Sequence, residues 1–167
     1  VPLDATGHFI LTAAVVDNGS SDNCGITQIL LDQTAFDCSN LGSNMVTLTV
    51  KDPAGLQSSC VAIVTVVDTT PPLPNVGSLP TVTNQCTVTL TRPTATDACA
   101  GIITATTTNA LTYSAQGDYT VYWTYTDTYS NSVTQTQSVK VHDTTAPEIT
   151  VCSPARTAQA GTNCQAA

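Results

Sequence analysis

The sequence predicts an all-β protein made of tandem immunoglobulin-like β-sandwich modules, and three observations support this prediction. The chain is rich in Thr and Val, whose side chains are stiff at χ1 and fit a pleated, half-buried surface. Short runs alternate apolar and polar residues, and no stretch shows a sustained helical period. A block of sequence also recurs along the chain, which indicates that one small fold is repeated.

The predicted strands are runs with a period of two, as expected where one face of a strand is buried. Turn residues such as Gly, Asn, Asp and Pro separate these runs at loop spacing. In chain order, the apolar positions of the runs are Val46/Leu48/Val50, Val64/Val66, Val88/Leu90, Val121/Trp123/Tyr125 and Val139/Val141.

Three anchors of the repeat share one offset of 75 residues: 143 − 68, 97 − 22 and 127 − 52. The first anchor is Asp68-Thr69-Thr70-Pro71-Pro72, which recurs as Asp143-Thr144-Thr145-Ala146-Pro147. We therefore expect a module over 1–70 that lacks its opening strand, a second module over 71–146, and the opening strand of a further module over 147–167. A module of this size buries a modest core, so a disulfide is a natural supplement.

Composition excludes two classes of function. The formal net charge is −8, and only four Lys and Arg residues are available to neutralise a phosphate backbone, so we expect no nucleic-acid partner. Apolar runs stay well below the roughly 18 residues that a membrane-spanning helix needs, so we expect no membrane insertion.

The repeated pattern resembles the hyalin repeat (HYR) domain. The resemblance rests on Asp22-Asn23-Cys24, Asp97-Ala98-Cys99 and the two Asp-Thr-Thr-x-Pro segments, and it extends over almost the whole chain. It implies an immunoglobulin-like β-sandwich in long extracellular multi-repeat proteins, among them adhesins of bacterial cell surfaces. It implies no enzymatic activity.

The seven cysteines predict a disulfide framework, since no CxxC pair or neighbouring His suggests a metal site. Cys86 and Cys99 are the only cysteines of the second module, so we expect them to pair. Cys60 would bond to Cys152 of a neighbouring copy, because the second module lacks the counterparts of both. Cys24 would bond either to Cys164 of a neighbouring copy or locally to Cys38, and spacing alone does not decide between these.

The two ends of the chain read as parts of one repeat. The segment 162–167 followed by residues 1–2 parallels the segment that leads into the second module. We therefore expect the partners of this chain to be further copies of itself. These copies are either covalently continuous or completed by strand donation from the tail of a neighbour.

Asp residues near the module junctions suggest calcium, because loop carboxylates can supply a hard cation with oxygen ligands. Turn capping is the competing explanation for each of them, and it is the favoured one. A catalytic site is not expected, since neither His8 nor His142 lies in a triad-like setting. The calcium candidates are Asp22, Asp52, Asp68, Asp97, Asp127 and Asp143.

Two kinds of surface feature remain. Trp123 is expected in the core, whereas Tyr122 and Tyr129 are open to surface contacts, for instance with a glycan. Asn18 begins an N-linked sequon, and Thr69 and Thr144 lie in Asp-Thr-Thr segments that are candidates for O-glycosylation.

These observations favour a structural repeat of an extracellular fibre, stalk or filament at the cell surface. The alternative is an adhesin module that binds a surface glycan or protein through loops such as 17–22.

Overall fold

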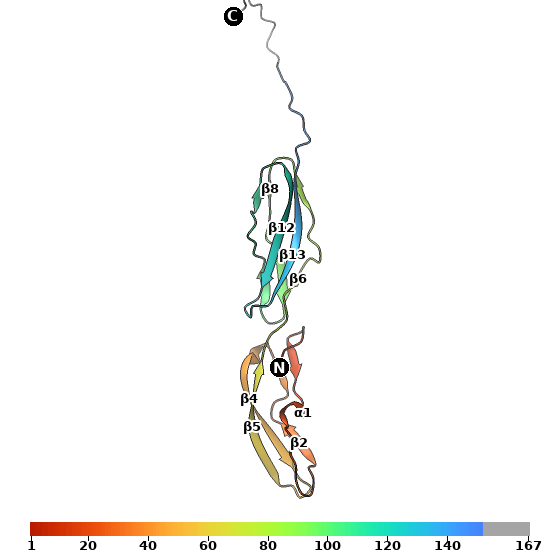
Figure 1. The fold of residues 1–167 in the computed structure, drawn as a ribbon, viewed down its shortest axis with the longest axis vertical. Helices are drawn as coiled ribbons and strands as arrows, with labels where there is room; N and C mark the ends of the chain where they lie inside the picture. Colours follow the sequence, from red (N-terminus) through yellow and green to blue (C-terminus); the bar gives the residue numbers. More distant parts are fainter. Residues whose placement is uncertain (152–167) are drawn as a thin grey trace, which may run out of the picture.

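The computed structural model describes residues 1–151, which form two elongated β-rich units arranged end to end (Figure 1). The N-terminal unit comprises the elements up to β5, and the C-terminal unit comprises β6 to β13. The elements of the N-terminal unit are β1 (His8–Ile10), α1 (Ala13–Val16), β2 (Gln28–Leu31), β3 (Ala35–Asp37), the 3-10 turn η1 (Cys38–Asn40), β4 (Gly42–Lys51) and β5 (Gln57–Val66).

The C-terminal unit consists of strands and connecting loops. Its elements are β6 (Leu73–Pro74), β7 (Val82–Asn84), β8 (Val88–Thr89), β9 (Thr94–Asp97), β10 (Gly101–Thr104), β11 (Thr112–Tyr113), β12 (Gly117–Thr126) and β13 (Ser132–Val141). The all-β prediction is confirmed: several antiparallel sheets are present, and α1 is a single turn. None of the helices in residues 1–151 has the length and apolar character needed to cross a membrane.

Each sheet is made of strands from one unit only. The N-terminal unit contains the pair β1-β3 and the sheet β2-β4-β5, and the C-terminal unit contains β10-β9-β6, β11-β8 and β12-β13-β7. The long antiparallel hairpins β4–β5 and β12–β13 dominate the two units. This arrangement is consistent with two small immunoglobulin-like sandwiches.

The structure reproduces the sequence repeat residue for residue in these hairpins. β4 and β12 begin at 42 and 117, and β5 and β13 begin at 57 and 132, so both pairs differ by 75. In both hairpin turns the Asp carboxylate accepts a hydrogen bond from the backbone N–H four residues later, Asp52 from Leu56 and Asp127 from Asn131, each at 2.8 Å. Gly55 and Ser130 take the positive φ that this turn requires.

Two separate hydrophobic cores confirm that alternating residues face inward. The C-terminal core contains Val88, Leu90, Val121, Trp123, Tyr125, Val139 and Val141, and the N-terminal core contains Leu3, Leu11, Phe36, Val46, Val64 and Val66. Trp123 is completely buried, as expected, and its indole N–H donates to Gln137 Oε1 at 3.0 Å. Because a buried polar group must find a partner, this bond lets the indole occupy the core without a penalty.

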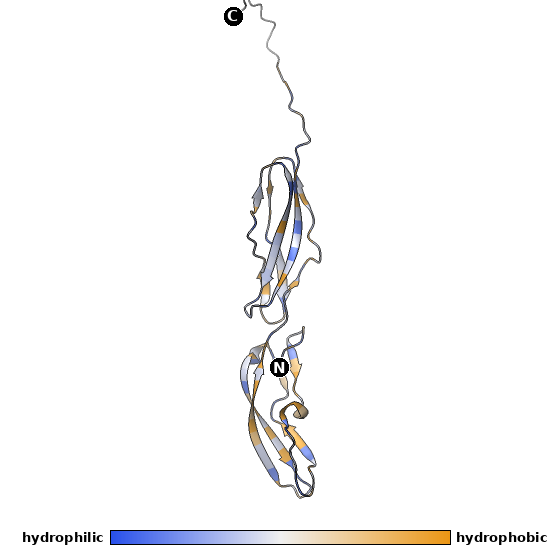
Figure 2. Ribbon diagram, viewed as in Figure 1, coloured by the Kyte–Doolittle hydropathy of each residue, from blue (hydrophilic) through white to orange (hydrophobic). Residues whose placement is uncertain are grey.

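More of the ribbon has the hydrophobic colour in the N-terminal unit than in the C-terminal one (Figure 2), and more of the exposed large hydrophobic side chains belong to the N-terminal unit. Met45 and Ile63 are directly opposite each other on β4 and β5, and both are largely exposed. The first residues of the chain pair in parallel with Val67, the residue that follows β5. Leu3 N–H donates to the Val67 carbonyl at 3.0 Å, and Val67 N–H donates to the Val1 carbonyl at 3.0 Å. β7 pairs with β13 in the same parallel sense.

Candidate functional site: the junction between the two units

A disulfide links the two units. Cys38, the first residue of η1, bonds to Cys99 in the turn between β9 and β10, with the two Cα atoms 5.2 Å apart. The bond joins residues 61 positions apart in the sequence, and it attaches the end of one sandwich to the beginning of the next.

This pairing corrects two expectations from the sequence. Cys86 does not bond to Cys99, because Cys86 follows β7 at the end of the C-terminal unit remote from the junction, whereas Cys99 lies at the junction. Cys24 does not bond to Cys38, because Cys38 is bonded to Cys99 and Cys24 is a free, exposed thiol. Cys24, Cys60 and Cys86 are free and exposed among the described residues.

Local hydrogen bonds fix the two cysteine-bearing turns. Asp37 caps η1: its Oδ1 accepts from the Ser39 backbone N–H at 2.8 Å and from the Ser39 hydroxyl at 2.6 Å. These bonds, led by the hydroxyl, lower the pKa of the Asp37 carboxyl. Asp97 Oδ1 accepts from the backbone N–H groups of Cys99 and Ala100, each at 2.8 Å. Both sulfur atoms are therefore positioned by an Asp that closes its own turn.

Gly7 makes room for the disulfide. Its φ is +77°, and a Cβ added there would lie 2.7 Å from Cys38 Sγ and 3.3 Å from Ala98 Cβ. The position therefore demands glycine for two reasons, namely the left-handed backbone and the close approach of the sulfur.

The connection between the units is short and is held in place by hydrogen bonds and burial. Only residues 67–72 separate β5 from β6. Val67 is held by the parallel pairing with the first residues, and Pro72 is fully buried. Leu73 then enters the β6–β9 pairing opposite Thr96. The Asn131 side-chain amide of the C-terminal unit donates to the Asp68 carbonyl at 3.3 Å.

Three carboxylates meet at this junction. Asp68 comes from the connection, Asp97 from the end of β9 and Asp127 from the β12–β13 turn, and one carboxylate oxygen of each lies within 4.8 Å of the others. All three residues are buried, with exposed fractions of 8%, 6% and 8%. Within residues 1–151, the Lys and His ion pairs both go to Asp118, and none reaches these three carboxylates.

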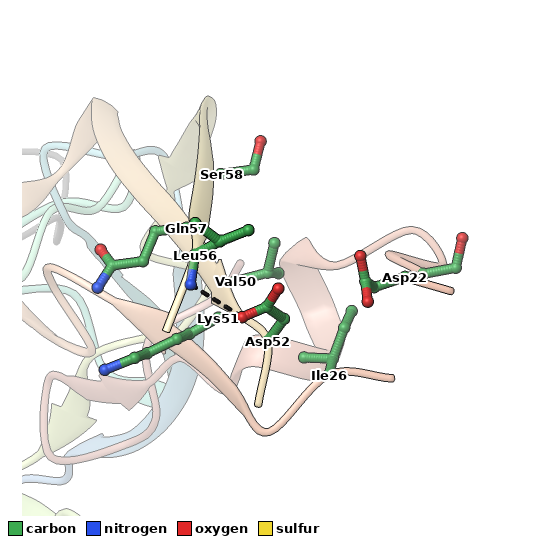
Figure 3. Close-up of a pocket in the computed structure, with 9 residues that line it drawn as sticks. Asp22, Ile26, Val50, Lys51, Asp52, Leu56, Gln57 and Ser58 are labelled. Atoms are coloured by element: carbon green, nitrogen blue, oxygen red, sulfur yellow. Dashed lines mark hydrogen bonds between the residues drawn. The ribbon is translucent and has the colours of Figure 1, made fainter. Parts of the chain in front are cut away.

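The structure does not bring the other three calcium candidates into this cluster. Asp22 and Asp52, which correspond to Asp97 and Asp127 by the 75-residue offset, line one pocket at the far end of the N-terminal unit (Figure 3). The dashed line in Figure 3 is the hydrogen bond from Leu56 N–H to Asp52. Asp143, the counterpart of Asp68, is exposed after β13. The six Asp residues therefore do not form one site.

The remaining surface candidates are exposed where the structure describes them. Tyr122 and Tyr129 are partly exposed, and Tyr129 lines a groove at the junction with Leu41 and Val67 of the N-terminal unit. Asn18, Thr69 and Thr144 are exposed, and their glycosylation stays a prediction. Cys152 and Cys164 lie outside the described residues, so the bonds expected between copies also stay predictions.

Sequence reasoning missed three residues of the junction: Gly7, Cys38 as the partner of Cys99, and Asn131. One signal for the disulfide was available. Position 113, the counterpart of Cys38 in the second repeat, is Tyr, so Cys38 has no equivalent within the repeat and was a candidate for a bond that leaves its own unit. No local pattern marks Gly7 or Asn131.

No protein-family model matches the chain. The chain is similar to hyalin of Strongylocentrotus purpuratus, with 35% identity in a 154-residue alignment that covers 84% of this chain and 13% of hyalin. The chain thus spans about an eighth of the relative it matches. The relative is a sea urchin protein, so this comparison does not show the bacterial origin that the resemblance to adhesins suggested. Taken with the 75-residue repeat and the all-β fold, it supports a hyalin-repeat-type domain in this chain.

Proposed function

We propose that this chain is a structural repeat of an extracellular fibre or stalk, in which successive units are joined end to end by rigid junctions. The observation that carries the proposal is the disulfide between Cys38 and Cys99, because it covalently fixes one sandwich to the next. A disulfide is typical of oxidising, extracellular compartments. The similarity to hyalin favours the same location, and it favours a structural domain over an enzyme.

The far end of the N-terminal unit supports continuation of the array. Three residues of the N-terminal unit correspond to junction residues of the C-terminal unit through the 75-residue offset. They are Asp22, Cys24 and Asp52, and their counterparts are Asp97, Cys99 and Asp127. The Cys24 thiol is exposed. The N-terminal unit therefore presents the same set of residues that the C-terminal unit uses to meet its neighbour, and a preceding unit would complete it.

Further copies of the chain are the partners that this arrangement requires. They would be linked covalently or by a donated tail strand, and Cys60 with Cys152, or Cys24 with Cys164, would lock the contact. Reductive trypsin digestion of native material distinguishes the two linkages. A peptide running from Thr157 through Ala167 into Val1 and on to Lys51 would show peptide continuity. Separate peptides ending at Ala167 and starting at Val1 would favour strand donation.

A second candidate function is ligand binding by an adhesin module. The observation in its favour is the pocket at the far end of the N-terminal unit, which Ser21, Asp22 and Asp52 line (Figure 3). The same residues correspond to the junction carboxylates, so a role in joining units explains them with fewer assumptions.

Immunogold labelling separates these two functions. An antibody raised against the 167-residue chain is applied to the native surface material, and its position is recorded by electron microscopy. A structural repeat predicts gold particles at regular intervals along fibres. Label confined to fibre tips, or absent from fibres, would contradict the structural role and favour the adhesin.

A further inference from the structure

We propose that the junction carboxylates of Asp68, Asp97 and Asp127 form a calcium site that stiffens the connection between the two units. The three residues come from three separate segments, namely the connection, the β9–β10 turn and the β12–β13 turn. The ion would therefore bind the end of one unit and two loops of the next at once.

The proposal rests first on a buried oxygen that has no partner. Asp68 is more than nine-tenths buried. Its Oδ2 nevertheless accepts no hydrogen bond from any residue that the structure describes. Its Oδ1 is occupied, because it accepts from the Thr70 backbone N–H at 2.9 Å. Buried polar atoms in native proteins are almost always satisfied, and an exception calls for a ligand, a water or an ion.

The neighbouring carboxylates share this arrangement. Asp97 uses Oδ1 to close its turn onto Cys99 and Ala100, and Asp127 uses Oδ1 to accept from Tyr129 and Asn131. In Asp68 and Asp97, Oδ1 orients the carboxylate, and Oδ2 accepts no hydrogen bond from the residues that the structure describes. Asp127 Oδ2 also accepts from the Asn131 amide at 2.8 Å, which holds this side chain in place beside Asp68.

The charge balance points to a cation. Three carboxylates lie within 4.8 Å of one another in a buried setting, and the ion pairs of the described Lys and His residues lie elsewhere, on Asp118. Like charges this close repel strongly when water is excluded. Either a bound cation or a proton must compensate them, and the experiment below distinguishes the two.

The donor set favours calcium among cations. All the candidate ligand atoms are oxygens, and Cys99, two residues after Asp97, is joined to Cys38 in a disulfide, so it offers no thiolate to a softer metal. Calcium accepts six to eight oxygens in a flexible geometry, which suits carboxylates from three independent segments. Magnesium demands shorter bonds and near-octahedral geometry.

The test is a thermal melt of the oxidised full chain in EDTA and in increasing CaCl₂ at constant ionic strength, followed by the fluorescence of Trp123. We expect a saturable rise in melting temperature, with a half-effect at about 10⁻⁴–10⁻³ M or lower, as in other extracellular calcium modules. MgCl₂ at equal concentration should give a smaller rise.

The decisive variants are Asp68→Asn and Asp143→Asn. Asp143 lies in the same Asp-Thr-Thr motif and accepts the same 2.9 Å hydrogen bond from the N–H two residues later, but it is exposed and outside the cluster. Asp68→Asn should raise the calcium concentration for half-effect at least ~10-fold, the change expected for loss of one ion ligand or its support. Asp143→Asn should leave it unchanged.

A second measurement separates ion binding from a purely structural role of Asp68. In EDTA, Asp68→Asn should melt no lower than the parent chain, because the substitution removes one repelling charge. The proposal is overturned if calcium does not raise the parent's melting temperature, if magnesium acts equally, or if Asp68→Asn keeps the parent's calcium response. The inference goes beyond the fibre role. A tip-only gold label would contradict the fibre and leave the calcium response intact.

Discussion

The disulfide between the units should contribute a large, measurable part of the stability of the C-terminal unit. Replacing both Cys38 and Cys99 by Ser removes a cross-link between residues 61 positions apart. Treated as loop-closure entropy of the unfolded chain, a loop of that length corresponds to about 4 kcal/mol at 25 °C. When the N-terminal unit stays folded, the unfolded loop that the disulfide closes is about half as long. Because the loop-closure entropy depends on the logarithm of loop length, the stabilisation by the disulfide falls only by about 0.5 kcal/mol.

Urea unfolding followed by Trp123 fluorescence measures this contribution, since the single Trp lies in the C-terminal core. We expect the double variant to lose about 3–4 kcal/mol in the free energy of unfolding. A unit of this size has a total stability of only about 4–11 kcal/mol, so the midpoint should shift by a large fraction of its value.

Cys86→Ser is the matched control. Cys86 is an exposed free thiol in the same unit, and a surface substitution there should change the free energy of unfolding by less than about 0.5 kcal/mol. A loss of less than about 1 kcal/mol in the double Ser variant, or a larger loss in Cys86→Ser, would contradict this contribution of the disulfide.

Three further predictions concern the junction, the core and the thiols. Gly7→Ala should destabilise the oxidised chain by about 2 kcal/mol or more in a chemical melt, because it forces a positive φ and a contact with Cys38 Sγ. Gly19→Ala, where φ is +90° and nothing lies within 4 Å, should cost only about 1 kcal/mol; equal costs would mean that the sulfur contact is unimportant. Trp123→Ala should cost about 3–5 kcal/mol and unfold or nearly unfold the C-terminal unit, while amide NMR signals of the N-terminal core persist. Loss of both sets of signals would contradict two separate cores, and the exposed Tyr122→Ala serves as the neutral comparison. Native alkylation followed by peptide mapping should modify Cys24, Cys60 and Cys86 but not Cys38 or Cys99; protection of Cys86 together with modification of Cys38 would contradict the pairing.

The parts of the fold that depend on local pattern could be predicted from the sequence. The alternation of Val121, Trp123 and Tyr125 identified the buried face of β12, and the 75-residue offset located the matching hairpin of the other unit. These features follow from the period of a strand and from turn chemistry, both of which act over a few residues.

The junction could not be predicted to the same extent because it depends on distant segments. Their presence in one module suggests that Cys86 pairs with Cys99, but the segment between them, which contains β8 and β9, places them at opposite ends of the sandwich. Sequence spacing does not determine disulfide connectivity when the bond crosses between units. In contrast, all three residues of the carboxylate cluster were among the Asp residues singled out from the repeat, although their grouping required the fold.

We infer that the disulfide, the short connection and the packed junction hold the two units in one fixed orientation, as a rigid segment of a fibre requires. Residual dipolar couplings of backbone amides in the oxidised chain test this most directly. Couplings from β4–β5 and from β12–β13 should fit a single alignment tensor if the junction is rigid. Two tensors of different magnitude would show that the units reorient independently, and this would contradict the rigid junction.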